Sequence, residues 1–312
     1  MENQVPTRVS VIIPCFNGSR FLAEAIESVL AQNYPNFEVV VVDDGSTDES
    51  KEIAKHYDDV HYLFQENQGV SVARNRGYRE SSGEYLLFLD YDDRLLPHAL
   101  QLNVENLIAH PECGCVAGGH RLIDSHGNLL SLVLAKQVEN FQLSGIVDYK
   151  TLISGHTLAS PSGSMFRRHV LEAVNGFDPI YRSGEDMDLY LRLARKFPIF
   201  CDDEVIFEYR RHDTNKSGDG QRAMNNCLGI LDRQWPYIEG NSEYESAYKI
   251  GRKMWQNFFY KTIPYDVASY LKRKKFDKAS QLLLLGLRHS PYSFVQYTME
   301  YLSKRIGLKK LV

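Results

Sequence analysis

The chain has 312 residues and a formal net charge of -4, with 43% hydrophobic and 24% charged residues. These values are ordinary for a globular protein and exclude a single small core, so we expect one large domain with an appendage. The longest aliphatic run, residues 282–285, is too short to cross a bilayer, and no basic-then-apolar segment opens the chain. We therefore expect no signal peptide and a cytoplasmic location. Five cysteines without zinc-site spacing are expected to be reduced, structural thiols.

The first eighty residues alternate between apolar runs and amphipathic segments. Strands are predicted over 9–14, 37–42 and 62–64, and helices over 20–32, from residue 49, and over 70–80. Pro14 is expected to end the ladder of the first strand, and Ser46 or Thr47 to cap the second helix. Strands and helices alternating at this spacing predict βαβ units and a parallel sheet.

Residues 85–89, YLLFL, are apolar throughout and predict a strand that is buried on both faces. The strand leads directly into Asp90, Asp92 and Asp93. Open α/β sheets bind ligands at this edge, and two carboxylates one residue apart can share a divalent cation. Helix capping would need only one aspartate, so a metal site is favoured, although capping stays an equal alternative for Asp93. No glycine-rich phosphate motif follows either acidic strand end, which disfavours Rossmann dinucleotide binding and P-loop chemistry.

Six groups of short motifs follow one another along the chain. They are VIIPCFN (11–17), VDDGSTD (42–48), NQG with ARNRG (67–69 and 73–77), LDYDD (89–93), GFD with SGEDMDL (176–178 and 183–189) and YRRH (209–212). In this order they resemble the inverting glycosyltransferases of family 2 with the GT-A fold, over about residues 8–217. The resemblance implies a GT-A domain over 1–220, with a Rossmann-like mixed central sheet and flanking helices. A basic helical C-terminal region over 221–312 follows it.

The resemblance implies metal-dependent, inverting transfer of a hexosyl or N-acetylhexosaminyl group from a nucleotide diphosphate sugar. A UDP-sugar is the expected donor, a saccharide or lipid-linked molecule the acceptor, and surface polysaccharide or glycan synthesis the setting. Such chemistry needs Mn²⁺ or Mg²⁺ on the leaving diphosphate and a carboxylate to take the acceptor proton. Two rivals stay open. A non-catalytic sugar-nucleotide-binding relative is disfavoured by the presence of Asp186, and a sugar nucleotidyltransferase by the lack of a glycine-rich basic loop after the first strand.

The resemblance also assigns residues to the donor side of the site. These are Pro14, Phe16, Asn17, Asp44, Arg74, Asp90 and Tyr91. Asp44 is expected to accept a hydrogen bond from the uracil N–H, and Asp90 to face the ribose. For Phe16, contact with the base and plain core packing are equal alternatives. Arg74 is favoured as a nucleotide contact over an exposed arginine without a specific role, since a guanidinium suits planar and phosphate partners.

The same resemblance makes Asp92 a metal ligand. His212 is a second candidate ligand, with a purely structural histidine equally open; its imidazole would suit Mn²⁺ better than Mg²⁺. Asp186, the last acid of the ED motif, is the expected base, and Glu185 is expected to position the acceptor. The alternative for Asp186 is a capping box with Ser183.

The middle of the chain carries fewer signals. Residues 115–119 predict a strand whose edge is open to a ligand, and 160–164 a loop; in the family this region lines the acceptor site. Residues 203–211 predict one more strand. The polar, glycine-containing segment 213–220 is typical of a mobile lid over the donor.

The tail is predicted to be helical from residue 221, and 276–291 resembles one helix of a tetratricopeptide unit, which must dock on another surface. From Lys261 to Val312, eleven Lys and Arg residues stand against three Asp and Glu, a net charge of +8, so the preceding 260 residues carry -12. Basic clusters at 272–275 and 304–310 favour anionic lipid headgroups over nucleic acid, for which no motif is present. We therefore expect peripheral association with the inner face of the membrane.

Overall fold

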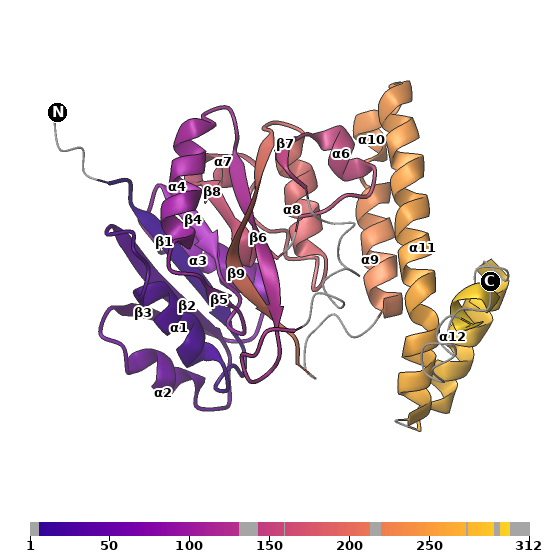
Figure 1. Ribbon diagram of the computed structural model, residues 1–312, viewed down its shortest axis with the longest axis horizontal. Helices are drawn as coiled ribbons and strands as arrows, with labels where there is room; N and C mark the ends of the chain where they lie inside the picture. Colours follow the sequence, from indigo (N-terminus) through magenta and orange to yellow (C-terminus); the bar gives the residue numbers. More distant parts are fainter. Residues whose placement is uncertain are drawn as a thin grey trace. The chain divides into compact units, whose positions relative to one another are not determined.

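The computed structural model of the chain describes residues 6–130, 143–158, 160–212, 220–272, 274–289 and 294–299. The chain forms two compact units, Met1–Leu152 with His156–Asp213, and Ile153–Gly155 with Thr214–Val312. The first unit is built on a β-sheet with helices, and the second is helical (Figure 1). The division into 1–220 and 221–312 stays a proposal.

One mixed sheet organises the described part of the first unit, in the order β3-β2-β1-β4-β8-β6-β9-β5, with β7 beside β9. The strands are β1 (Val9–Cys15), β2 (Phe37–Asp44), β3 (Val60–Gln65), β4 (Tyr85–Phe88), β5 (Arg94–Leu95), β6 (Cys115–Ile123), β7 (Gly145–Val147), β8 (Ser164–Arg167) and β9 (Ile199–Arg210). Strands β1 to β4 are parallel, β8 is antiparallel to both β4 and β6, and β9 is parallel to β6. Strands β1, β2, β4 and β9 therefore end at one edge of the sheet, and the predicted mixed α/β fold is confirmed.

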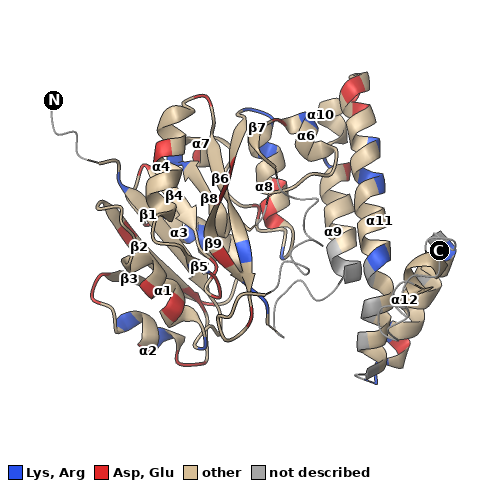
Figure 2. Cartoon of the chain, viewed as in Figure 1, with Lys and Arg blue, Asp and Glu red and all other residues tan. Residues whose placement is uncertain are grey.

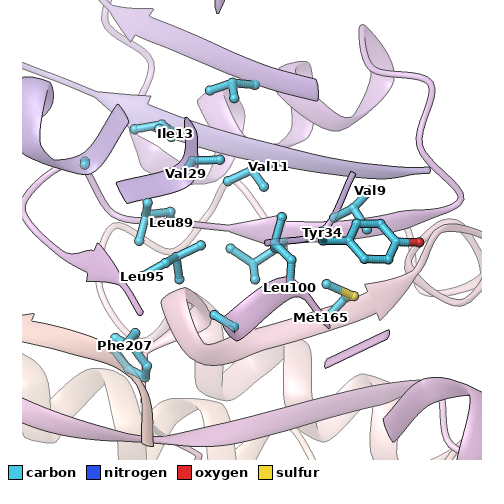
Figure 3. Packing of buried hydrophobic residues seen from close by; sticks show 14 of the residues in the cluster. Val9, Val11, Ile13, Val29, Tyr34, Leu89, Leu95, Leu100, Met165 and Phe207 are labelled. Carbon is cyan, nitrogen blue, oxygen red and sulfur yellow. The ribbon is translucent and has the colours of Figure 1, made fainter. Parts of the chain in front are cut away.

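Helices cover both faces of this sheet. They are α1 (Leu22–Leu30), α2 (Ser50–Lys55), α3 (Val70–Arg79), α4 (Ala99–Ala109), α6 (Tyr149–Ile153), α7 (Arg168–Ala173) and α8 (Glu185–Ala194). Alternate residues of β1 point to opposite faces. Val11 shares a buried cluster with α1 and α4 (Figure 3), whereas Ile12 lies against Gly77 of α3. Apolar cover on both sides explains why β1 is an uninterrupted apolar run.

The strand at the centre of the sheet, β4, is buried along its whole length, as its sequence predicts. Leu87 belongs to the cluster under α1 and α4. On the other face Phe88 packs edge-to-face against Phe166 and Phe177, with ring centroids 5.8 and 4.9 Å apart. The acidic residues that follow β4 thus start from a rigid support.

Three local predictions were wrong. β1 continues through Pro14, which pairs with Val42 of β2; because β4 pairs with β1 only as far as Ile12, the proline has a single neighbouring strand and interrupts no ladder on the other side. Neither Ser46 nor Thr47 caps α2, since both bind the loop after β1; Asp48 Oδ1 instead accepts a hydrogen bond from the N–H of Ser50 at 3.1 Å. Over Cys115–Ala117, strand β6 has no open edge because β8 and β9 pair with it there on its two sides.

The second unit consists, in its described part, of helices α9 (Gly220–Asp232), α10 (Trp235–Ile238), α11 (Ser242–Lys272) and α12 (Phe276–His289), followed by residues 294–299. The predicted helical extension is confirmed there. Although α11 is 31 residues long, neither it nor any other described helix is apolar over enough of its length to span a bilayer. The lid predicted over 213–220, except its last residue, and the basic cluster at 304–310 lie outside the described residues. All five cysteines are buried and none of them forms a disulfide, as predicted.

The contact between α3 and the sheet yields a stability prediction. A Cβ on Gly77 would lie 2.3 Å from Cγ2 of Ile12 and 3.0 Å from Cγ2 of Val42. Gly77→Ala should therefore lower the free energy of unfolding by roughly 1–3 kcal/mol through overpacking, measured by urea denaturation. Gly229→Ala in α9 is the control, because no atom lies within 4 Å of its added Cβ. An unchanged urea midpoint for Gly77→Ala would contradict this packing.

Candidate active site

Polar side chains collect at the sheet edge where β1, β2, β4 and β9 end. The loop after β1 and the loop after β2 are joined there by short hydrogen bonds. The backbone N–H of Asn17 donates to Ser46 Oγ, and its Oδ1 accepts from the N–H of Thr47, each at 2.9 Å. The N–H of Gly18 donates to Ser50 Oγ at 2.9 Å. Asn17 has a φ of 51°, a left-handed conformation that asparagine adopts more readily than most residues.

The aromatic residues of this edge differ in exposure. Phe16 is 41% exposed, which excludes core packing as its role. Tyr91 is half-buried, and its Cδ2 would lie 2.6 Å from a Cβ on Gly18, so its ring closes against the loop after β1. Pro14 is buried within β1. The exposed ring of Phe16 therefore lies beside a loop that hydrogen bonds hold in place.

Asp44, at the end of β2, is buried and accepts three hydrogen bonds. Its Oδ1 accepts from Gln65 Nε2 at 2.7 Å and from the N–H of Gln68 at 2.9 Å, and its Oδ2 from the N–H of Gly69 at 2.8 Å. A carboxylate offers about four acceptor positions, so one remains for another donor. The carboxylate thus holds the loop before α3 in place, and its expected contact with a nucleobase stays a prediction.

The residues after β4 form a turn, in which the N–H of Asp93 donates to the carbonyl oxygen of Asp90 at 3.0 Å. Two serines lock this turn. Ser162 Oγ accepts from the N–H of Asp90 at 3.1 Å and donates to Asp93 Oδ2 at 2.7 Å, and Ser160 Oγ donates to Asp90 Oδ2 at 3.1 Å. Asp93 also accepts from the N–H of Arg210 at 3.0 Å, so it joins β9 to the turn and does not cap a helix. Burial, reinforced by the neighbouring carboxylates, raises the pKa of Asp93 well above its usual range.

Asp92 and His212 meet although 120 residues separate them. His212 Nε2 lies 2.8 Å from Asp92 Oδ2, and both side chains are largely buried. Burial and the nearby Asp90 raise the pKa of Asp92, while the contact with His212 opposes this shift. Among the described residues no cluster of three His, Cys, Asp or Glu has metal-site geometry. An imidazole nitrogen beside a carboxylate oxygen nevertheless suits Mn²⁺, and substrate phosphates and water would supply the remaining ligands of the cation.

Arg210 belongs to the YRRH motif but is not among the predicted site residues. It contacts Asp92 directly and His212 through the ring of Phe21. It is fully buried; its Nε donates to the carbonyl oxygen of Asp92 at 2.8 Å, and its Nη2 to Glu24 Oε2 at 2.7 Å. Its guanidinium stacks on Phe21 at 4.7 Å, and the Phe21 ring lies 4.9 Å from that of His212. The alternation of β9 is the sequence signal for this position, because it puts Glu208 and Arg210 on the same face of the strand. In the structure both side chains are buried.

Arg74 of α3 bridges the donor side and the start of α8. Its side chain is 3% exposed, so the alternative of an exposed arginine was wrong. Nη2 lies 2.6 Å from Asp90 Oδ1 and Nη1 lies 2.9 Å from Glu185 Oε1. These two carboxylates raise the pKa of Arg74 although its burial acts in the opposite direction.

Asp186 follows in the first turn of α8, where Figure 2 shows acidic residues gathered. Gly184, with a φ of 81°, occupies the N-cap of α8, which is the position that a capping box would assign to Ser183. Burial is the main cause that raises the pKa of Asp186 to about 6; Glu185 adds to the shift, and Arg74 opposes it. A carboxylate with this pKa is ionised at neutral pH and is a stronger base than an ordinary aspartate.

The geometry of this edge agrees with what sequence and fold comparisons find. Residues 10–174 match the model of glycosyl transferase family 2. An uncharacterised glycosyltransferase of Rickettsia typhi is 30% identical over 303 residues, covering 91% of this chain and 86% of its own length.

Several solved structures share the fold. S. aureus TarS 1–349 in complex with UDP-GlcNAc has a TM-score of 0.61 at 16% identity, over 96% of this chain and 92% of that one. The mannosyltransferase PcManGT from Pyrobaculum calidifontis, in complex with GDP-Man and Mn²⁺, has a TM-score of 0.59 at 19% identity, over 98% and 89%. The chain therefore belongs to glycosyl transferase family 2, and it is a glycosyltransferase with the GT-A fold.

Proposed function

We propose that the chain transfers a hexosyl or N-acetylhexosaminyl group, with inversion, from a nucleotide diphosphate sugar to a saccharide or lipid-linked acceptor in glycan or surface polysaccharide synthesis. A UDP-sugar is the expected donor. The observation that carries the proposal is the contact between Asp92 and His212 at the sheet edge, together with the electrostatic interaction of the buried Asp186 with Asp90 of the same turn. Arg74 links the two halves of this arrangement through its two carboxylate partners. The complexes of TarS with UDP-GlcNAc and of PcManGT with GDP-Man add support for a nucleotide-sugar donor.

On the donor side, Asp44, Phe16 and Asn17 would hold the base. Phe16 offers an exposed ring face, and Asp44 one further acceptor position. Asp90 would face the ribose. Tyr91 and Pro14 complete this set, whereas Arg74, which the family resemblance also assigns to the donor side, binds Asp90 and Glu185.

Asp92 and His212 are the residues that would hold Mn²⁺ or Mg²⁺. When bound there, the cation would serve as a Lewis acid that stabilises the negative charge of the leaving diphosphate. The contribution of the chain is to hold the two ligands close to each other and out of bulk water. Arg210 and Phe21 serve this purpose through their contacts with Asp92 and His212.

Asp186 would act as the general base. As the acceptor oxygen forms its bond to the anomeric carbon, the bond from that carbon to the diphosphate oxygen breaks, and the hydroxyl proton passes to the Asp186 carboxylate. A single displacement of this kind inverts the anomeric carbon. Glu185, next to it and fixed by Arg74, would position the acceptor.

A panel of nucleotide sugars, tested with and without Mn²⁺ and with products identified by mass spectrometry, tests the proposal. Release of nucleoside diphosphate with transfer of the sugar supports it. Formation of a nucleotide sugar from a sugar phosphate would favour a nucleotidyltransferase, and binding without turnover a non-catalytic relative.

The metal assignment predicts the effect of Asp92→Asn. This change should lower kcat by about 10²-fold or more, because Lewis-acid assistance contributes several kcal/mol and about 1.4 kcal/mol corresponds to a factor of ten. It should also weaken the binding of UDP in the presence of Mn²⁺ but not in its absence, as measured by calorimetry. Near-wild-type turnover would refute the assignment.

The base assignment predicts a pH dependence. Because the pKa of Asp186 is raised to about 6, kcat/KM should fall as the pH drops below about 6 and the carboxylate takes up a proton. Asp186→Asn should lower kcat by about 10²- to 10⁴-fold and leave UDP binding intact. Glu172→Gln, at an exposed position of α7, is the control and should keep both the rate and the pH profile. Loss of UDP binding in folded Asp186→Asn would move this residue to the donor side.

We further propose that the basic C-terminal region binds an anionic membrane surface. Helix α12 supports this proposal because it exposes large apolar side chains, with Phe276 63% and Leu284 67% exposed. Lys274, Lys275 and Lys278 are exposed at or near its start. Apolar side chains together with basic residues are typical of helices that lie in a membrane interface.

Vesicle co-sedimentation tests this surface. The wild-type protein should sediment with vesicles that contain phosphatidylglycerol and be released by moderate salt, since screening weakens the attraction. Leu284→Asp should reduce sedimentation several-fold. Ile250→Asp, a similarly exposed apolar position on α11, is the matched control. Equal sedimentation of both variants, or none of the wild type, would reject the membrane as partner.

A further inference from the structure

The fork of Arg74 joins two parts of the site that are far apart in the sequence. One terminal nitrogen binds Asp90 in the turn after β4, and the other binds Glu185 at the start of α8, 111 residues further along than Arg74. Each carboxylate lies on a separate element, so the guanidinium fixes the separation between these elements. A planar guanidinium that binds a carboxylate at each of its two terminal nitrogens holds those carboxylates at a fixed distance. A lysine, with a single ammonium group, could not replace it.

The same face of α3 also holds the segment that leads into α8. Asn75 Nδ2 donates to the carbonyl oxygen of Phe177 at 2.6 Å, and the N–H of Phe177 donates back to Asn75 Oδ1 at 2.9 Å. Ser71 Oγ donates to the carbonyl oxygen of Tyr181 at 3.2 Å. Ser71, Arg74 and Asn75 are spaced i, i+3 and i+4, so they share one side of the helix. This side of α3 therefore holds the segment 177–185 in place through hydrogen bonds.

We propose that Arg74 is a positioning residue that sets the distance between the turn after β4 and Asp186. It affects the sugar-transfer step through Asp186 and does not touch the nucleotide. The inference rests on the proposed function, in which Asp186 is the base. It departs from the expectation that Arg74 contacts the nucleotide, because the side chain is only 3% exposed and each of its terminal nitrogens already directs one N–H at a carboxylate.

The charges around Asp186 give this role a distinct signature. The groups that act on it are Glu185 and Tyr190 of its own helix, Arg74 of α3 and Asp90 of the turn after β4. Arg74 lowers the pKa of Asp186, whereas Glu185 raises it. Removing the charge of Arg74 should therefore raise the pKa of Asp186, and removing that of Glu185 should lower it.

Three variants test the inference, namely Arg74→Met, Arg74→Lys and Glu185→Gln. In Arg74→Met the acid limb of kcat/KM should move up by about one pH unit, since an opposite charge at this range shifts a carboxyl pKa by about 1–3 units. Arg74→Lys should keep the limb near that of the wild type but lower kcat about tenfold or more, because one ammonium cannot span both carboxylates. Glu185→Gln should move the limb down. Arg79→Met, at an exposed position of α3, is the control.

Two further measurements separate positioning from other roles. Calorimetry with UDP and Mn²⁺ should give a Kd for each Arg74 variant within about threefold of the wild type, as expected of a residue that makes no nucleotide contact. Carbon NMR of protein labelled at the aspartate carboxyls, with Asp186→Asn for assignment, should show the same pKa shifts as the kinetics. A UDP Kd weakened tenfold or more with an unmoved Asp186 pKa would make Arg74 a nucleotide contact and overturn the inference.

Loss of Arg74 leaves two carboxylates without their cation, which can unfold a protein. If Arg74→Met does not fold, Glu185→Gln decides, and an Asp186 pKa unchanged in that variant overturns the inference. The NMR titration needs no turnover. If the pKa of Asp186 shifts in the variants but the wild-type protein transfers no sugar, only the proposed function is rejected. If the wild type transfers sugar but the pKa of Asp186 does not move in the variants, only the positioning role is rejected.

Discussion

Three carboxylates at the end of a buried strand are the constraint on which the rest of this site depends. Asp90, Asp92 and Asp93 lie within a span of four residues after β4, and burial raises the pKa of the last two. Ionised groups withdrawn from water are costly unless charges or hydrogen-bond donors compensate them. Here Arg74 pairs with the first, His212 contacts the second, and the third accepts hydrogen bonds from a serine and from the backbone of Arg210.

The compensating groups come from elements that the mixed sheet brings together. Strand β8 runs antiparallel to β4 and to β6, so β6 and β9 regain the direction of β4. As a result β9 delivers Arg210 and His212 to the edge where β4 delivers its aspartates. Arg210 in turn binds Glu24 of α1, so the residues that compensate the acidic turn also tie the first helix to the last strand of the unit.

Much of the fold could be predicted from local patterns. The apolar runs of β1, β2 and β4 and the amphipathic periods of α1 and α3 follow from residue spacing alone, since a strand buried on both faces and a half-buried helix leave different patterns. Pro14 was misjudged because its effect depends on where the neighbouring strand ends, and β4 pairs with β1 only to Ile12. The open edge expected at 115–119 was wrong over 115–117 for the same reason, since strand order is not a local property.

The family and the acidic character of the sheet edge can be read from the sequence alone, because ordered motifs and strand periods are carried by neighbouring residues. Tertiary structure decided how each polar residue is used. An arginine on an amphipathic helix can be exposed or buried, and only the approach of Asp90 and Glu185 makes burial of Arg74 tolerable. The pKa of Asp186 likewise depends on burial and on charges distant in sequence, because electrostatic interaction follows distance in space and not along the chain.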